Sequence, residues 1–302
     1  MAVQKVIGSS FQSMGTGGVR KDNSAVAISG IILTTSDFSF ATMADAVDET
    51  KWTDGVKAKY VFPMFGLDSY ENQSTDATIY ESPAQRRKLL RLGKKRFMFN
   101  FDLPLDSHKA LQSFRNADIR MFIVEEDGKI RGYNDAGVFK GFTTSLVNPG
   151  KMAEVAPDGA APALTPLYVD MENYREWDEN GDFFYPSWEA ANIEPLVPVT
   201  LTVVSAIATK VVVKVGSNDG WEPATGLPKF VGIKGIVVGD FVFLKTAGTA
   251  NTITTLTDNG DGTYDLNGTA FTTGTLNLKP ANTMVSEGLL IDSNGSVAVT
   301  IA

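Results

Sequence analysis

Cysteine is absent from this chain of 302 residues, and histidine occurs once, as His108. The absence of cysteine excludes disulfides, thiolate metal sites and cysteine nucleophiles, and it fits folding in a reducing cytoplasm. The single histidine excludes a His-rich metal site, and a Ser-His-Asp triad would depend on that one residue. We therefore predict that the protein is not an enzyme and holds neither a cofactor nor a metal.

Long apolar runs are also missing. The most apolar segment, 196–207, is interrupted by Pro198 and by three hydroxyl residues, so we expect no membrane span. The first thirty residues lack the apolar core of a signal peptide, and we expect no export. The formal net charge is −8, which argues against general nucleic-acid binding because a duplex-binding surface needs clustered Lys and Arg.

Three regions differ in composition. Residues 1–30 are rich in Gly, Ser, Thr and Asn and predict a flexible arm, which either stays disordered or becomes ordered along a neighbouring subunit. Residues 31–196 hold the strongest folding signals, with strands and loops expected over 31–70. Residues 197–302 are dominated by Thr, Val and Gly and predict a separate domain after a boundary near residue 196.

The clearest pattern lies between Lys94 and Phe142. Large apolar residues first occupy every second position, which predicts a half-buried strand: Phe97, Phe99, Phe101 and Leu103. Helical spacing then predicts a short helix over 106–114. Alternation returns over 119–124, 129–133 and 138–144 and predicts further strands. A long loop is expected over 149–166, which is rich in Pro, Gly and Ala.

Positive charge is segregated near residue 90. Ser82 and Pro83 predict the start of a helix and Gly93 its end. This helix and its exit carry seven basic residues and no acid: Arg86, Arg87, Lys88, Arg91, Lys94, Lys95 and Arg96. Since the chain has 27 basic and 35 acidic residues, the remainder carries 20 against 35, a balance of −15.

Acidic residues gather between 170 and 182, where six acids accompany only Arg175: Asp170, Glu172, Glu176, Asp178, Glu179 and Asp182. Aromatic residues are interleaved with them, which suits a folded surface better than a solvated tail. We predict that the basic run of one subunit docks on the acidic stretch of another and fixes the register of a repeating assembly. A solvated helix face and a nucleic-acid site are the alternatives.

The C-terminal region shows short alternating segments over 199–204, 210–215, 241–245, 252–256, 269–273 and 297–301, separated by turns such as Asp258-Asn259-Gly260-Asp261-Gly262. Six or seven strands with almost no helical pattern are typical of a β-sandwich.

Other motifs favour ordinary structural roles. His108 has no nucleophile or orienting carboxylate at a local spacing.

The segments 178–182 and 258–261 have oxygen-rich side chains, but their glycines fall at the wrong positions for a calcium loop, and turn chemistry explains them more simply. Gly15-Thr16-Gly17-Gly18 lacks the lysine of a phosphate-binding loop. A hydrolase using Asp178 and Glu179 is disfavoured because neighbouring residues of a strand point to opposite faces.

The order of several segments resembles the tail tube and related ring-forming proteins of tailed bacteriophages. The resemblance rests on Tyr80-Glu81-Ser82-Pro83, Gly93–Phe99, Leu111–Phe114, Ile119–Val124 with Asp127-Gly128 and Gly132, and Lys140-Gly141-Phe142-Thr143. The region from about 197 is similar to the immunoglobulin-like modules often appended to such proteins, including the hairpin from Asp258 to Tyr264. The acidic and aromatic stretch at 167–190 has no place in the family pattern.

This resemblance implies a mainly β fold, with a tail-tube-like β-sandwich or barrel over 31–196, one or two short helices, and an immunoglobulin-like sandwich over 197–302. It implies a structural protein of the virion, assembled in the host cytoplasm, whose homo-oligomeric rings, commonly hexameric, stack with other virion proteins around a conduit through which the genome passes without specific binding. The alternative is a head-tail connector or capsid decoration protein whose C-terminal sandwich binds a host surface or carbohydrate, with Trp221 and Phe230 as candidates.

Overall fold

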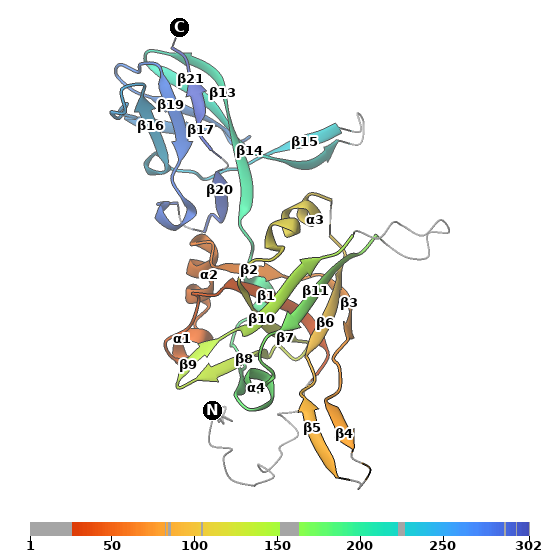
Figure 1. The fold of residues 1–302 in the computed structure, drawn as a ribbon. Helices are drawn as coiled ribbons and strands as arrows, with labels where there is room; N and C mark the ends of the chain where they lie inside the picture. The colour runs from red at the N-terminus through yellow and green to blue at the C-terminus, as the bar shows by residue number, and fades with distance from the viewer. Residues whose placement is uncertain are drawn as a thin grey trace. The chain divides into compact units, whose positions relative to one another are not determined.

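The computed structural model describes residues 26–81, 83, 86–103, 105–151, 163–222, 227–286, 288–293 and 295–301 (Figure 1). The chain divides into two compact units, unit 1 over Met1–Glu194 and unit 2 over Pro195–Ala302. The predicted mainly β fold is confirmed. Most of the predicted N-terminal arm lies outside the described residues, but 28–30 already belong to the first strand. Among the described residues, none of the helices has the length and apolar character needed to cross a membrane.

Unit 1 contains most of the helices. Its strands are β1 Ile28–Thr35, β2 Val61–Met64, β3 Leu67–Asn72, β4 Thr78–Glu81, β5 Arg87–Arg91, β6 Arg96–Phe101, β7 Ile119–Glu125, β8 Ile130–Asp135, β9 Val138–Lys140, β10 Phe142–Pro149, β11 Thr165–Met171 and β12 Gly181–Phe184. Its helices are α1 Met43–Val47, α2 Glu49–Lys57, α3 Leu105–Leu111 and α4 Tyr174–Asp178, with single 3-10 turns at Gln112–Phe114 and Ala190–Asn192.

The main sheet of unit 1 bends around an apolar core. Its strand order is β12-β8-β7-β10-β11-β6-β3, with β1 beside β7 and β2. Strand β10 starts beside β7 and continues beside β11, so it belongs to both halves of the bend. The predicted strand from Phe97 is confirmed as β6, and Phe97, Phe99 and Phe101 all lie in the core. The predicted loop over 149–166 lies largely outside the described residues.

Strand β7 is buried on both faces, which the alternation of its sequence did not indicate. Met121 and Ile123 enter the main core, while Phe122 packs against Trp52 of α2, with 5.0 Å between the ring centroids. The prediction of strands and loops over 31–70 is wrong where α1 and α2 cover this second face. Thr42 caps α1 through a capping box with Asp45, a local signal that the sequence already contained.

The predicted helix over 82–93 is also wrong, because this segment forms a β-hairpin. Strands β4 and β5 pair in an antiparallel two-stranded sheet, with Tyr80 opposite Lys88 and Glu81 opposite Arg87. Pro83 lies in the turn between them, a position that suits its fixed φ as well as a helix start does. The paired strand supplies the backbone hydrogen bonds that the expected helix would have made internally.

Unit 2 has a layered β architecture. Its strands are β13 Val197–Ile207, β14 Lys210–Glu222, β15 Leu227–Gly232, β16 Phe241–Lys245, β17 Thr255–Asp258, β18 Thr263–Asn267, β19 Gly274–Leu278, β20 Ile291–Ser293 and β21 Val297–Val299, with 3-10 turns at Val238–Asp240 and Ala281–Thr283. One sheet has the order β17-β18-β14-β13-β20 with β15 beside β14, and the other has the order β16-β19-β21. One apolar core contains residues of both sheets, including Val213, Phe243 and Leu276.

The strand expected over 269–273 is not formed. Phe271 instead enters the core as part of a loop and packs against Phe243, with 5.2 Å between the ring centroids. The strand starts after it, at Gly274, whose Cβ would lie 1.9 Å from the carbonyl oxygen of Leu244 on the paired strand. Only glycine fits this close approach of two backbones.

Candidate assembly interface

The β4–β5 hairpin, residues 73–95 with its neck, extends away from the bent sheet of unit 1 (Figure 1). Opposite residues of an antiparallel pair lie on the same face, so Ile79 and Leu89 share one face with Arg87, and Tyr80 and Lys88 share the other. The apolar side chains are exposed on both faces, at 56% for Ile79 and 50% for Tyr80. An isolated two-stranded ribbon is at best marginally stable in water, so the exposed apolar side chains make this hairpin a candidate contact surface.

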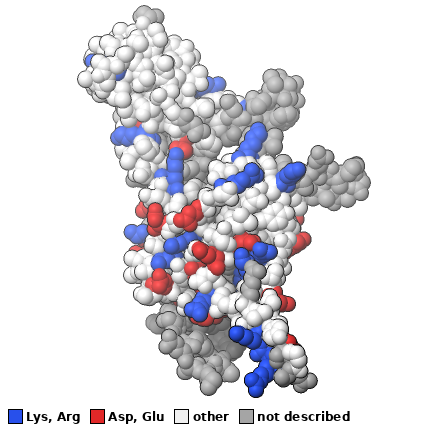
Figure 2. Space-filling model, viewed as in Figure 1, with Lys and Arg blue, Asp and Glu red and all other residues white. Residues whose placement is uncertain are grey.

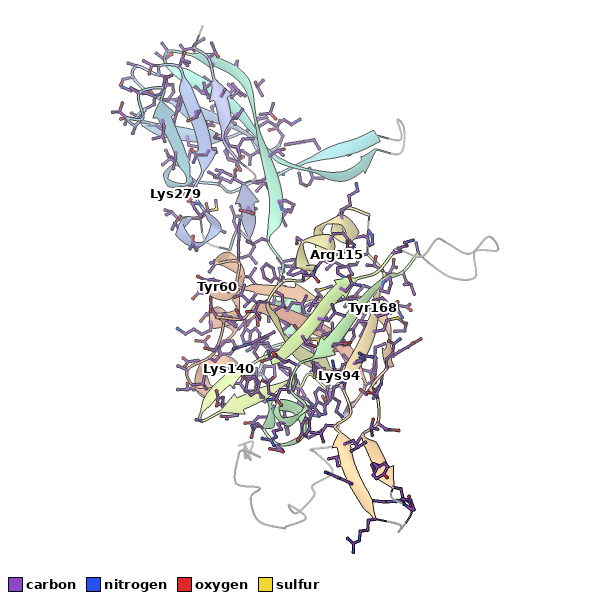
Figure 3. All side chains as sticks on the ribbon, viewed as in Figure 1. Tyr60, Lys94, Arg115, Lys140, Tyr168 and Lys279 are labelled. Carbon is purple, nitrogen blue, oxygen red and sulfur yellow. The ribbon has the colours of Figure 1, made fainter. Side chains whose placement is uncertain are left out.

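The neck of the hairpin fixes it to the rest of unit 1. The Thr75 backbone N–H donates to the Lys94 carbonyl oxygen at 2.9 Å, and the Lys94 N–H donates to Thr75 Oγ1 at 3.1 Å. Gly93 lies so close that a Cβ there would be 2.0 Å from the Thr75 carbonyl oxygen. Lys94, labelled in Figure 3, marks this junction. The projection therefore continues β3 and β6 and is not a loose loop.

The structure divides the basic run between the hairpin and the body of unit 1. Arg86, Arg87 and Lys88 are exposed near the end of the hairpin, where Arg87 Nε lies 3.1 Å from Glu81 Oε2. Lys and Arg are prominent on this projection in Figure 2, whereas both signs of charge are mixed over the rest of unit 1. Arg91 continues β5, and its side chain lies outside the described residues.

The acidic stretch is largely engaged within its own chain. Strand β11 lies beside β6 and brings Asp170 opposite Arg96, with Oδ2 at 2.9 Å from Nε. Lys95 Nζ lies 3.7 Å from Asp178 Oδ1 and 5.5 Å from the centroid of the Trp177 ring. The two predicted sets therefore meet inside one subunit at these pairs.

Two further acids of the stretch are buried. Glu176 accepts hydrogen bonds from the Thr143 backbone N–H at 2.7 Å and from its hydroxyl at 2.9 Å. Asp182 is 2% exposed, and burial raises the pKa of its carboxyl although Asn134 and the Phe183 N–H donate to it. Glu172 and Glu179 remain exposed, with Glu179 3.7 Å from Arg175. Glu172, Asp178 and Glu179 are therefore still accessible, and docking on another subunit remains a prediction.

A buried ionic cluster, missed by the sequence analysis, lies at the turn between β7 and β8. Lys129 is fully buried, with Nζ 2.7 Å from Glu125 Oε2 and 3.1 Å from Asp127 Oδ2. Arg131 Nη2 lies 2.6 Å from Glu125 Oε1. Burial acts to lower the pKa of Lys129, but the hydrogen bonds to the two carboxylates outweigh it and raise that pKa. The same contacts outweigh burial at Asp127 and lower its pKa.

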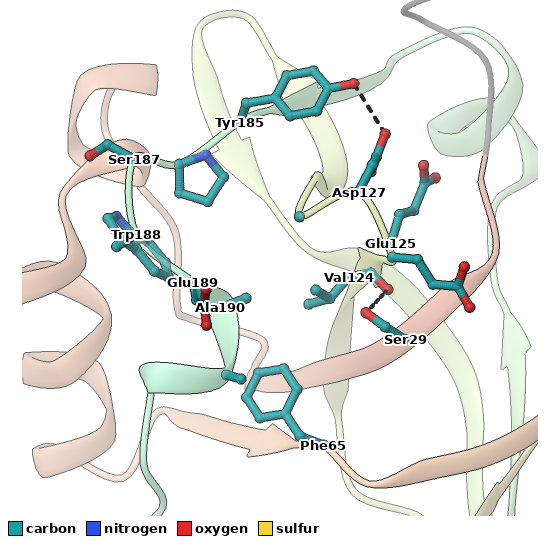
Figure 4. Close-up of a pocket in the computed structure, with 14 residues that line it drawn as sticks. Ser29, Phe65, Val124, Glu125, Asp127, Tyr185, Ser187, Trp188, Glu189 and Ala190 are labelled. Atoms are coloured by element: carbon teal, nitrogen blue, oxygen red, sulfur yellow. Dashed lines mark hydrogen bonds between the residues drawn. The ribbon is translucent and has the colours of Figure 1, made fainter.

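A hollow of about 550 Å³ opens beside this cluster (Figure 4). One wall is the turn from Val124 to Gly128, together with Ser29, and the facing wall is the segment 185–191. Phe65 and Trp188 contribute apolar surface, and Tyr185 donates across the opening to Asp127 at 3.2 Å. The sequence carried no signal for this hollow, because its walls come from segments about sixty residues apart.

The remaining candidates have structural roles. His108 Nδ1 lies 3.1 Å from the Thr165 hydroxyl. Asp258 and Asp261 accept backbone N–H groups two residues ahead, from Gly260 at 2.8 Å and from Thr263 at 2.9 Å, as in ordinary turns. Within the described part of the chain, His, Asp and Glu form no group of three or more that could hold a metal ion.

Comparison with known proteins leaves the function to be inferred from these features. No protein-family model matches the chain. No curated protein matches it significantly. The exposed hairpin is accordingly the feature that carries the functional argument.

Proposed function

We propose that this chain is a non-enzymatic structural subunit of a tailed-bacteriophage virion, which forms rings that stack into the tail tube. The supporting observation is the β4–β5 hairpin, whose apolar side chains are exposed on both faces and whose strands pair with no third strand of the described chain. Burying such side chains against a partner removes apolar area from water, which stabilises the contact by about 25 cal/mol per Å². A second subunit would supply that partner.

The way the hairpin is attached also supports assembly into a series. Its neck is fixed by backbone hydrogen bonds and by the close approach at Gly93, so each subunit presents the projection in one direction. A projection that docks on a different surface of the next copy makes a head-to-tail contact, and such contacts generate rings or open stacks. The acidic balance of the chain suits a conduit, because it repels the phosphates of the genome.

The alternative, in which unit 2 recognises a host surface, receives no specific support from its aromatic residues. Phe230 is half-buried, and Lys214 Nζ lies 3.8 Å from its ring centroid. The side chain of Trp221, the other candidate, lies outside the described residues. We therefore keep the assembly role as the single proposed function.

The test combines electron microscopy with mass determination of the full-length chain, in low and high salt. A hairpin variant replaces Ile79, Leu89 and Leu90 by Thr, which keeps the preference for extended backbone and removes apolar surface. A matched control replaces Val204, Ile207 and Val285 of unit 2, exposed at 60%, 52% and 61%, by Thr.

We expect rings or tubes from the wild type and from the control, and smaller species from the hairpin variant with an unchanged circular dichroism spectrum. If the hairpin variant formed rings at the same concentration as the wild type, assembly would not depend on the apolar side chains of the hairpin. A wild-type chain that remains monomeric at every concentration and salt would contradict the proposed function.

A further inference from the structure

The hollow beside the ionic cluster has an acidic rim that forms no ion pair with the described part of its own chain. Glu126 and Glu189 line it from opposite walls and are exposed. Neither carboxylate forms an ion pair with a described residue, in contrast to Glu125 and Asp127, which contact Lys129. The rim therefore presents two carboxylates to solvent, one on each side.

The floor and walls between these carboxylates are mostly apolar or aromatic. Phe65, Val124 and Trp188 contribute to the surface, and Ala190 narrows it (Figure 4). A concave site of this size, apolar inside and polar at its edge, is the usual form of a pocket that encloses a protruding group. Its chemistry selects a partner with an apolar body and a positive charge beside it.

One face of the hairpin carries this combination. Tyr80 is exposed on the same face as Lys88, and Arg87 lies next to Lys88 in the strand, on the other face. The hairpin does not fill the hollow of its own chain, because its apolar side chains remain at least half exposed. The hairpin also projects from the β3 and β6 side of the sheet. The turn that lines the hollow joins β7 and β8, which are separated from β6 by β10 and β11 in the strand order.

We propose that the hollow is the receptor for the β4–β5 hairpin of a second copy of this chain. Tyr80 of that copy enters between Phe65 and Trp188, while Lys88 on the same face meets Glu126 and Glu189 and Arg87 adds positive charge from the next position of the strand. The inference rests on the proposed function and specifies the two surfaces through which subunits join. The two surfaces differ, so the contact is head-to-tail, and contacts of this kind generate rings or open stacks.

The experiment uses full-length variants with reversed charge. The hollow variant is E126K/E189K, the hairpin variant is R87E/K88E, and the control D68K/E172K reverses two exposed carboxylates outside both surfaces. Each of the first two is expected to raise the concentration for half-assembly about tenfold or more, because like charges then face each other. The control is expected to assemble as the wild type does.

Mixing gives the decisive result. Each variant retains one intact surface, so the hairpin of the hollow variant can dock on the hollow of the hairpin variant, and the two reversed surfaces are again opposite in charge. We expect a mixture to form alternating assemblies that neither variant forms alone, and a chain carrying all four substitutions to regain assembly in part.

Other outcomes separate the two proposals. If the hollow variant assembles like the wild type while the hairpin variant does not, the hollow is not the receptor and the hairpin docks elsewhere, which leaves the proposed function standing. Failure of the mixture to associate would also overturn the receptor assignment. If the wild type never associates, both proposals fail together.

Discussion

Lys129 shows how one buried side chain organises a turn in unit 1. Its ammonium contacts Glu125 and Asp127, and it lies 5.3 Å from the centroid of the Phe183 ring and 5.6 Å from that of Tyr185. These contacts join the turn between β7 and β8 to β12 and to Tyr185, which follows it. A fully buried ammonium is tolerated because the carboxylates and rings around it replace water.

We predict that Lys129→Met lowers the free energy of unfolding by about 3–5 kcal/mol, because the buried carboxylate of Glu125 loses the ammonium 2.7 Å away and keeps Arg131 alone as an ion-pair partner among the described residues. Urea denaturation of the full chain measures the effect. Arg87→Met is the control, since the Arg87–Glu81 pair is exposed and exposed pairs contribute little. Equal midpoints for the two variants would show that the cluster does not stabilise the fold.

Tyr264 has a comparable role in unit 2. Its side chain is fully buried, and its hydroxyl donates to the Ile233 carbonyl oxygen at 2.8 Å and accepts from the Ile236 N–H at 3.3 Å. We predict that Tyr264→Phe destabilises unit 2 by about 1–3 kcal/mol, because the buried Ile236 N–H and the partly buried Ile233 carbonyl lose their partner. Hydrogen exchange at 233–236, followed by mass spectrometry, should show the loss of protection there.

The alkaline pH dependence of the same residue can be predicted. Burial raises the pKa of Tyr264 to about 12, above its ordinary value of 10.0. The folded state therefore holds the Tyr264 proton more tightly than the unfolded state does. The contribution of this tyrosine to the free energy of unfolding is complete below pH 10 and is lost as the pH rises toward 12. Thermal unfolding of wild type and Tyr264→Phe across this range should show a decline that is steeper in the wild type. Parallel curves would contradict this assignment.

At the scale of elements, the β4–β5 hairpin shows where local sequence signals mislead. Ser82, Pro83 and Gly93 have the order expected of a helix start and end. Pro83 also fits a turn, and Gly93 is required by the backbone of Thr75, which lies eighteen residues earlier. The helical preference of a short segment is weak compared with the hydrogen bonds between paired strands, so the hairpin is the more stable conformation.

Gly93→Ala tests this account of the neck. The added methyl group would push Thr75 away from Lys94, and overpacking of this kind costs about 1–3 kcal/mol. We expect faster tryptic cleavage within 86–96 and weaker assembly. Gly239→Ala is the matched control, because its Cβ would lie 3.3 Å from a flexible Val285 methyl group. Cleavage at the wild-type rate would show that the neck does not depend on this glycine.

At the scale of the whole molecule, the two units have separate cores. Strand β13 opens unit 2, and it pairs with β14 and β20 of the same unit. We predict that residues 195–302 fold alone, because a β-sandwich of about 100 residues can bury a sufficient core. A dispersed amide spectrum and cooperative thermal unfolding would support this. Strong dye binding without a cooperative transition would show that unit 2 depends on unit 1.

The sequence by itself determined the features that depend on composition and short-range period. The absence of cysteine excludes disulfides, alternation at Phe97, Phe99 and Phe101 indicated a strand with one buried face, and the C-terminal pattern indicated a β-rich unit. These properties need no knowledge of distant residues. The receptor and assembly roles of the charged segments remain predictions for the experiments described above.

Tertiary structure alone decided which charges meet and which surfaces stay open. The pairing of β6 with β11 brings Arg96 to Asp170 across 74 residues, and the turn at Lys129 comes within reach of Tyr185. The basic hairpin stays exposed because no third strand of the described chain pairs with it. Such outcomes depend on long-range pairing, whose free energy is shared among many residues and leaves no local signature.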